Sequence, residues 1–151
     1  MSPEGGDDLY VARAYTHKYF GNNQQAIGDY SKALELNPSR GEIYYDRAMI
    51  RASLGDYDAA SADLSDGIAI TPYCDSRYFY ARGIIRMKAN DHKQAIKDFT
   101  SAIAGYAGLP QAYECRALSY EAIGDLGGAE KDRAAVAGDE RGCVEPWRQR
   151  R

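Results

Sequence analysis

The sequence is poor in the residues on which most enzymes and metal sites depend. Its 151 residues include only two histidines and three cysteines, and no CxxC pair or Cys/His ligand spacing is present. It also lacks a glycine-rich phosphate loop, an HExxH motif and a paired-carboxylate signature. We therefore expect a protein that is not an enzyme and that holds no metal and no cofactor.

The few cysteines and the start of the chain bear on its compartment. Cys74, Cys115 and Cys143 are odd in number and far apart, which predicts three free thiols in a reducing environment. The first six residues, MSPEGG, lack the basic and apolar regions of a signal peptide. We therefore expect a cytoplasmic protein, and a periplasmic location stays open if a signal peptide has been removed.

An excess of positive charge and long apolar runs are also absent. The net charge is -3 and the pI is about 5.4, whereas proteins that bind nucleic acid or anionic membranes present a basic face. Apolar runs reach only a few residues, far too few to span a bilayer. The sequence thus argues against nucleic acid and membranes as partners.

Phenylalanine and tryptophan are scarce, but tyrosine is not. Thirteen tyrosines stand against three phenylalanines and one tryptophan. A tyrosine combines a large ring with a polar tip, which suits half-buried helix faces and binding surfaces.

What is present is an internal repeat. Four alanines recur at spacings of 34, 35 and 34 residues: Ala26, Ala60, Ala95 and Ala129. Five residues before each alanine stands a residue that tolerates the left-handed conformation at a helix end: Gly21, Gly55, Asn90 and Gly124. Twelve residues before each alanine stands a small residue: Ala14, Ala48, Gly83 and Ala117. Sixteen residues before it stands an aromatic: Tyr10, Tyr44, Phe79 and Tyr113.

This order predicts that each copy is a helix, a tight turn and a second helix. Small residues let two helices approach closely, and aromatic side chains fill the space beside them. We place the first helices near residues 8–20, 41–53, 76–89 and 110–123, and the second helices near 24–36, 58–70, 92–104 and 126–137. One such hairpin cannot bury its apolar face alone, so the copies must stack and share a core.

The order of aromatic, small residue, glycine, alanine and proline resembles the tetratricopeptide repeat, most closely from Gly21 to Pro38 (GNNQQAIGDYSKALELNP). The resemblance covers about residues 7–143 and implies an all-α fold, a right-handed superhelix (solenoid) of four helix-turn-helix repeats. It places a single repeat domain at 7–138, with repeats at about 7–40, 41–75, 76–109 and 110–143. Residues 1–6 form an N-terminal extension and residues 139–151 a tail. The last copy departs most, because Arg133 replaces an aromatic and Gly127-Gly128 weakens its helix.

A charge pair recurs with the repeat. An arginine and an aspartate stand sixteen residues apart in every copy: Arg13 and Asp29, Arg47 and Asp63, Arg82 and Asp98, Arg116 and Asp132. The pairs could form a four-fold anion or peptide site, or they could bridge neighbouring helices. We favour the bridge between helices, because opposite charges that recur together usually form ion pairs with each other. Arginine can also pair with a carboxylate in bidentate geometry.

In the family that this sequence resembles, the first helix of each repeat lines the inner, concave groove. Helical spacing then selects the candidate groove residues: Val11, Tyr15, Tyr19, Tyr45, Met49, Arg77, Tyr80, Ile84, Met87 and Leu118. Each side chain alone could instead close the packing between helices. One subtype of the family clamps a terminal carboxylate with basic and amide residues at the positions of Val11, Tyr15, Asp46, Arg77 and Ala81. Only Arg77 keeps the basic character, so the resemblance does not extend to that subtype.

Two functions follow from these observations. The first is an adaptor or scaffold whose groove binds a peptide or helix of another protein. The alternative is a structural protein that self-assembles through uncapped repeat ends, because no capping helix follows Gly138. The tail with Trp147 and its basic end could be a solvated terminus, could cover the last repeat's apolar edge, or could leave that edge to another subunit.

Overall fold

The computed structural model describes residues 6–71, 75–105, 109–138 and 142–148. Within these ranges the chain is all helical and has no strand. The helices are α1 (Gly6–Tyr19), α2 (Asn23–Leu36), α3 (Gly41–Ser53), α4 (Tyr57–Ile70), α5 (Ser76–Lys88), α6 (His92–Gly105), α7 (Pro110–Ala122) and α8 (Leu126–Ala135). Every end lies within two residues of the end that the repeat predicts. Cys74, Pro72, most of the N-terminal extension and the last two arginines lie outside the described residues.

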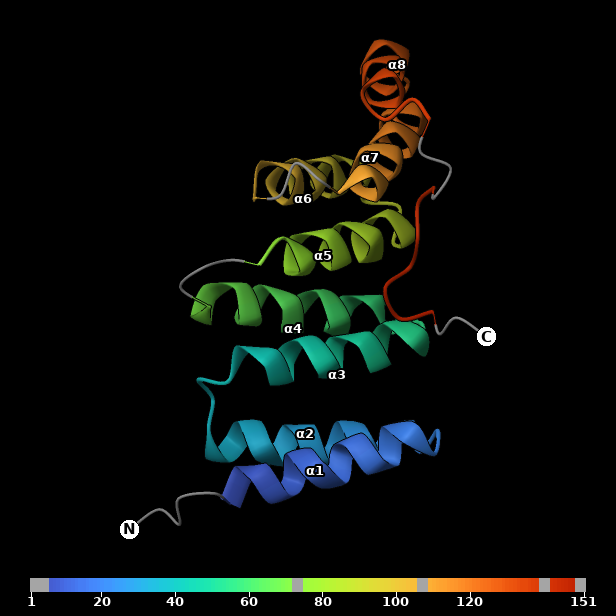
Figure 1. Cartoon of the computed structure of the whole chain (residues 1–151). Coiled ribbons are helices and arrows are strands. Elements are labelled where there is room, and N and C mark those ends of the chain that lie inside the picture. Colours follow the sequence, from blue (N-terminus) through green and yellow to red (C-terminus); the bar gives the residue numbers. More distant parts are fainter. Residues whose placement is uncertain (1–5, 72–74, 106–108, 139–141, 149–151) are drawn as a thin grey trace. The chain divides into compact units, whose positions relative to one another are not determined.

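The helices pair as four helical hairpins, α1 with α2, α3 with α4, α5 with α6, and α7 with α8 (Figure 1). Each turn places one residue in the left-handed conformation, with φ of 74° at Gly21, 82° at Gly55, 62° at Asn90 and 83° at Gly124. The next amide donates to a carbonyl five residues back, as from Asn22 to His17 at 2.8 Å and from Asp91 to Arg86 at 2.8 Å. This hydrogen bond ends the first helix, and the chain turns directly after it. The predicted helix ends at these four positions are thus confirmed.

Aspartates begin several of the second helices. The Asp56 side chain accepts a hydrogen bond from the amide of Ala59, and the Asp125 side chain accepts one from the amide of Gly128. These caps satisfy amides that have no partner inside the helix, so the turn and the helix start are encoded by adjacent residues.

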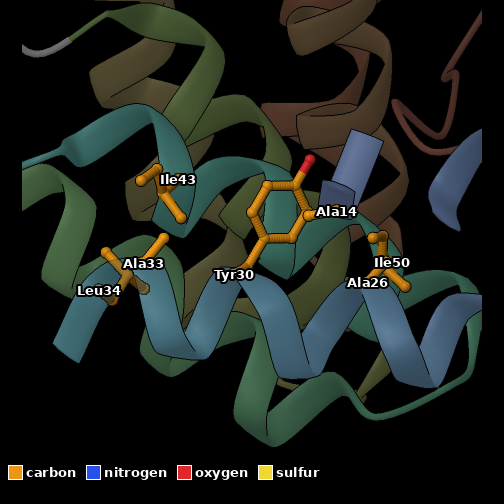
Figure 2. Packing of buried hydrophobic residues seen from close by; sticks show 7 residues of the cluster. All are labelled: Ala14, Ala26, Tyr30, Ala33, Leu34, Ile43 and Ile50. Carbon is orange, nitrogen blue, oxygen red and sulfur yellow. The ribbon is translucent and has the colours of Figure 1, made fainter. Parts of the chain in front are cut away.

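The chain divides into two compact units, 1–72 with α1 to α4 and 73–151 with α5 to α8. In the first unit the core forms between α1, α2 and α3 (Figure 2), where α2 contributes Tyr30 at its centre. The repeating alanines Ala14 and Ala26 are fully buried there, as the small positions predict. Small side chains at these points let the helices approach, and Tyr30, Ile43 and Ile50 fill the remaining space.

The core of the second unit is built on the same positions. Phe99 of α6 is fully buried and packs with Tyr80 and Ile84 of α5. A Cβ atom added at Gly83 would lie 2.6 Å from the Phe99 ring, so this position must lack a side chain for the ring to fit. In the fourth copy Arg133 takes the place of the aromatic and forms ion pairs with Glu114 and Glu121 of α7.

The expectation of three free thiols is wrong. Cys115 of α7 and Cys143 form a disulfide bond, with their Cα atoms 4.9 Å apart. Of the three alternatives left open for the tail, a solvated terminus does not hold for residues 142–148, because Cys143 and Trp147 pack against the core of the second unit. The spacing of 28 residues concealed this pairing, since only the fold brings the two side chains together.

None of the helices in the described ranges is long and apolar enough to cross a membrane. Over the same part of the chain, no group of three or more histidine, cysteine or acidic side chains could hold a metal ion.

Candidate functional site

Each unit carries a candidate site formed by those of the ten selected residues that lie on its own first helices, and we call this surface the first-helix face of the unit. In the first unit the face is open at α1, where Tyr15 is half exposed and Tyr19 is 85% exposed. Val11 and Tyr45 are half-buried, and Val11 packs against the core. Met49 is only 6% exposed, so a charge placed there would test folding rather than binding.

A polar cluster joins α1 and α3 on this face. The Tyr15 hydroxyl donates to Asp46 at 2.6 Å, and the Lys18 ammonium lies 3.5 Å from the same carboxylate. The hydrogen bond to Asp46 and partial burial raise the pKa of Tyr15 to about 12. An acid held at this position would repel a carboxylate ligand, so the cluster suits a neutral or basic group of a partner.

The ring of Tyr15 also meets the ring of Tyr30 edge to face, at 5.9 Å between centroids. Tyr30 is fully buried, and no group in the described part of the chain accepts or donates a hydrogen bond at its hydroxyl. Burial raises the pKa of Tyr30 above its usual range. The buried Tyr30 ring therefore supports the Tyr15 ring through this edge-to-face contact.

In the second unit the same face is mostly covered. Tyr80 and Ile84 of α5 are buried, Met87 is half-buried, and Leu118 of α7 is exposed. Arg77 is exposed and lies against the Asp75 carboxylate, which lowers the pKa of Asp75. The structure thus brings Tyr80, Ile84 and Met87 together in one cluster and leaves Arg77 and Leu118 at the surface.

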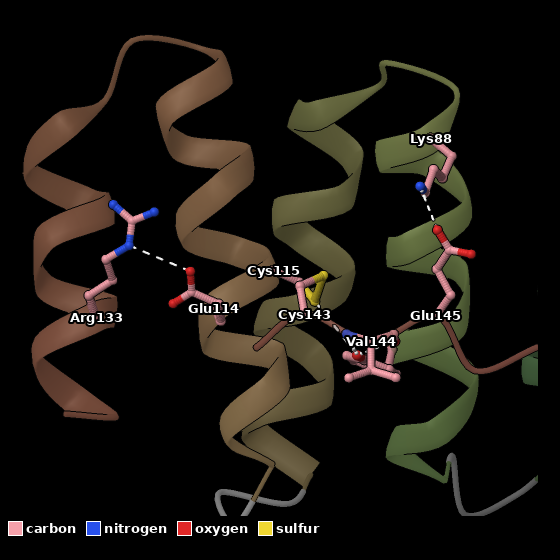
Figure 3. The surroundings of a disulfide bond; sticks show 8 residues. Lys88, Glu114, Cys115, Arg133, Cys143, Val144 and Glu145 are labelled. Carbon is pink, nitrogen blue, oxygen red and sulfur yellow. Dashed lines mark hydrogen bonds and ion pairs between the residues drawn. A yellow bond between two sulfur atoms is a disulfide. The ribbon is translucent and has the colours of Figure 1, made fainter. Parts of the chain in front are cut away.

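The covering segment is residues 142–148 of the chain itself, which we call the tail segment (Figure 3). The Tyr80 hydroxyl donates to the Val144 carbonyl at 2.6 Å and accepts from the Val144 amide at 3.2 Å. The Glu145 carboxylate lies 2.5 Å from the Lys88 ammonium. Trp147 and Cys143 pack against the cluster that contains Tyr80 and Ile84. The hydroxyl of one tyrosine therefore forms hydrogen bonds with both the amide and the carbonyl of Val144.

The recurring charge pairs are structural, as favoured from the sequence. Each arginine bonds its aspartate with two nitrogens, for example Arg47 to Asp63 at 3.0 and 2.6 Å. The aromatic three residues before the arginine lies under its guanidinium in every copy, with distances to the ring centroid of 5.4 to 5.8 Å. The aspartates are buried, so these pairs tie the two helices of a hairpin and offer no open anion site.

Sequence reasoning did not predict the contacts of two site features, the Asp46 cluster and the tail segment. Asp46 was considered only as a position at which one subtype of the family clamps a carboxylate, and its contact with Tyr15 was not predicted. The tail segment carried two usable signals, a cysteine and the single tryptophan of the chain, but neither could be assigned a partner without the fold.

The family model of the tetratricopeptide repeat matches residues 11–73, which span the hairpin turns and paired charges of the first two copies. Residues 11–73 of the chain are tetratricopeptide repeats. Two relatives agree with this family. Tetratricopeptide repeat protein 37 of Xenopus laevis is 26% identical over 124 residues, which cover 80% of this chain and 8% of the relative. The SGT1 homolog of Oryza sativa subsp. japonica is 35% identical over 71 residues, 47% of this chain and 19% of the relative. This tetratricopeptide repeat chain thus spans less than a fifth of the length of either relative.

Solved structures show the same all-α tetratricopeptide solenoid fold. A crystal structure of MamA superposes with a TM-score of 0.82 at 22% identity and covers 89% of this chain and 78% of that chain. The structure of YrrB, described as a tetratricopeptide protein with an unusual peptide-binding site, gives 0.77 at 21% identity and covers 87% and 67%. At this level of identity the likeness concerns the fold alone.

Proposed function

We propose that this chain, with its tetratricopeptide repeats, is a scaffold that binds a peptide or helix of another protein on the first-helix face of a unit. One observation carries the proposal: in the second unit this face already holds a non-helical chain segment, through the Tyr80 hydroxyl and a packed Trp147 ring. Side chains of this kind therefore suit a peptide.

The first unit supplies comparable side chains in an open state. Tyr15 and Tyr19 of α1 expose aromatic rings, and Tyr15 also bonds the Asp46 carboxylate. Exposed aromatics next to placed polar groups are typical of binding surfaces. The peptide-binding site named for YrrB and the net charge of this chain both support a protein as the partner rather than a nucleic acid.

The test is selection of binders from a random-peptide library on the wild-type chain, followed by affinity measurements on two variants. Tyr19→Ser removes an 85% exposed ring from the first-helix face, and Leu36→Ser removes a 56% exposed side chain from α2 as the matched control. Both positions are exposed, so both variants should fold. We expect Tyr19→Ser to weaken the selected peptides about tenfold, as loss of an aromatic anchor does, and Leu36→Ser to leave them unchanged. Equal affinities in all three proteins, or failure to select any peptide, would contradict the proposal.

A second candidate function, self-assembly through the repeat ends, is favoured by a different observation. Leu9 of α1 and Phe20, which follows α1, are 76% and 69% exposed, and Leu126 of α8 is also exposed. Apolar side chains left bare at the terminal helices are suited to stacking on another copy. Sedimentation across a range of concentrations tests this: the mass of the wild type should rise with concentration and that of Phe20→Glu should not. A constant monomer mass for the wild type would exclude it.

A further inference from the structure

The tail segment is bound to the second unit as a ligand would be. It has no helix of its own, and its contacts are those of a bound peptide: a backbone pair at Val144, an ion pair at Glu145 and an aromatic anchor at Trp147. Trp147 lies in a turn, in which the Arg148 amide donates to the Glu145 carbonyl at 3.2 Å. The hydrogen bonds to the Val144 amide and carbonyl do not depend on the side chain at that position. Any extended peptide could make the same pair with Tyr80.

The non-covalent hold on this segment is modest. One hydroxyl makes both backbone bonds, and the Lys88 side chain in the ion pair is 40% exposed, so that pair is screened by solvent. Trp147 and Val144 both keep part of their surface in water. The Cys115–Cys143 disulfide is the one covalent link between the segment and α7 among the described contacts, and it fixes the segment next to Tyr80. Without the bond the segment stays attached to the chain only through the residues that follow α8, so it is held near Tyr80 less closely.

The disulfide also lies beside the residues that bind the tail segment. The Cys115 sulfur lies 3.6 Å from the Tyr80 hydroxyl, and Cys115 is fully buried in the same cluster as Tyr80 and Ile84. Cys143 is only half-buried, so its sulfur is the one that a thiol from solution can reach. The disulfide and the residues that bind the tail segment thus belong to one cluster of side chains.

We propose that the tail segment is an internal ligand of the first-helix face, held there by the Cys115–Cys143 disulfide, and that reduction of this bond frees the face for an extended peptide of another protein. The inference rests on the proposed function and adds its regulation. A disulfide of this kind fits a protein that meets both oxidising and reducing conditions.

The reduction is a two-electron exchange with a dithiol reductant. One thiolate of the reductant attacks the Cys143 sulfur, the Cys115–Cys143 bond breaks, and Cys115 leaves as a thiolate that takes up a proton. The second thiol of the reductant, as its thiolate, then displaces Cys143, which also ends as a thiol. The reductant is left as a disulfide, so two electrons and two protons have moved to the protein.

The tail segment also indicates the chemistry of the partner. A competing peptide needs an extended backbone at Tyr80, an aromatic side chain in the place of Trp147, and an acidic side chain near Lys88. It needs no free terminal carboxylate, because the tail segment binds through internal residues.

The first experiment follows Trp147, the only tryptophan of the chain, by fluorescence and acrylamide quenching. The protein is the full chain with Cys74→Ser, so that Cys115 and Cys143 are the only cysteines left. We expect reduction to shift the emission to the red and to raise quenching severalfold, with unchanged helical circular dichroism. The control Cys74→Ser/Cys143→Ser should show the released signal with or without reductant. A Trp147 signal that reduction leaves unchanged in the first protein would overturn the inference and would leave the proposed function standing.

The second experiment measures binding of a synthetic probe, residues 142–148 with serine in place of Cys143, to the same Cys74→Ser protein. The internal segment competes in the oxidised state, so we expect the apparent affinity to rise by about tenfold or more on reduction. The same rise should be absent in Cys74→Ser/Tyr80→Phe, because the pair with the backbone is lost. If reduction releases Trp147 but the probe binds neither state, the face is not a peptide site in this unit, and the inference fails. Loss of the library peptides in Tyr19→Ser would still support the proposed function, so the two failures are distinguishable.

Discussion

At the residue scale, tyrosine accounts for most of the site. Tyr15 spans α1 and α3 through Asp46, Tyr30 supports its ring, and Tyr80 binds the backbone of the tail segment. Tyr15 and Tyr80 make their polar contacts through the hydroxyl, whereas Tyr30 contributes its buried ring. This is why an excess of tyrosine over phenylalanine was informative: a binding face needs area and polar tips at once.

The Tyr15 hydroxyl gives a prediction about alkaline pH. Its pKa of about 12 lies above the ordinary value of about 10, because the neutral phenol donates to Asp46. A raised folded-state pKa means that the bond stabilises fully below pH ~10 and is lost as the pH rises from ~10 through ~12. We expect Tyr15→Phe to cost about 1 kcal/mol at neutral pH and progressively less above pH ~10 in urea unfolding. Tyr19→Phe is the control, and a cost for Tyr15→Phe that is independent of pH would contradict the assignment.

At the scale of the helices, each hairpin is specified by a left-handed stop, a small residue and an aromatic on its first helix, and an arginine–aspartate pair. These features recur in all four copies, and this agreement is why helix ends could be predicted within two residues. The paired charges differ between copies in their exposure. The Arg13 side chain is 61% exposed, whereas the Arg47 side chain is 14% exposed and Asp63 also binds Arg51.

That difference predicts unequal costs for the same substitution. We expect Asp63→Asn to lower the free energy of unfolding by about 3 kcal/mol, because it leaves two poorly solvated arginines without their carboxylate. Asp29→Asn should cost about 1 kcal/mol, since Arg13 can turn to water. Urea unfolding followed by circular dichroism measures both. Equal costs would show that exposure of the arginine does not control the strength of the pair.

Gly83 predicts the cost of a single methyl group. Gly83→Ala places a Cβ atom 2.6 Å from the buried Phe99 ring, so we expect it to destabilise the chain by about 1–3 kcal/mol. Gly28→Ala is the matched control, because that helical position of α2 has no atom near the added Cβ. It should stabilise the chain by roughly 0.5–1 kcal/mol through helix propensity. Thermal unfolding compares the two, and similar shifts for both variants would refute the packing argument.

At the scale of the whole molecule, the disulfide links the start of one hairpin to the far end of the chain. It closes a loop of 28 residues of sequence separation around α7 and α8, the hairpin with the weakest helix and with Arg133 in place of an aromatic. The covalent bond therefore adds a constraint around this hairpin.

Loop closure of this length predicts a stability difference of about 3–4 kcal/mol between the oxidised and reduced second unit. Urea unfolding of the Cys74→Ser chain, followed by the fluorescence of Trp147 and by circular dichroism, should show a lower midpoint under reducing conditions. The same measurement on Cys74→Ser/Cys143→Ser should not depend on the reductant. An identical midpoint for oxidised and reduced Cys74→Ser would mean that the bond does not constrain the folded unit.

The sequence by itself determined the helices, the turns, the small and aromatic positions, the charge bridges and the family, because all of these depend on contacts at fixed short spacings that repeat four times. It also selected the first-helix face from helical periodicity. Only the tertiary structure decided that Met49, Tyr80 and Ile84 are buried, that Asp46 meets Tyr15, and that Cys143 reaches Cys115. Those contacts occur once, between segments 28 to 64 residues apart, and a contact that occurs once leaves no periodic trace in the sequence.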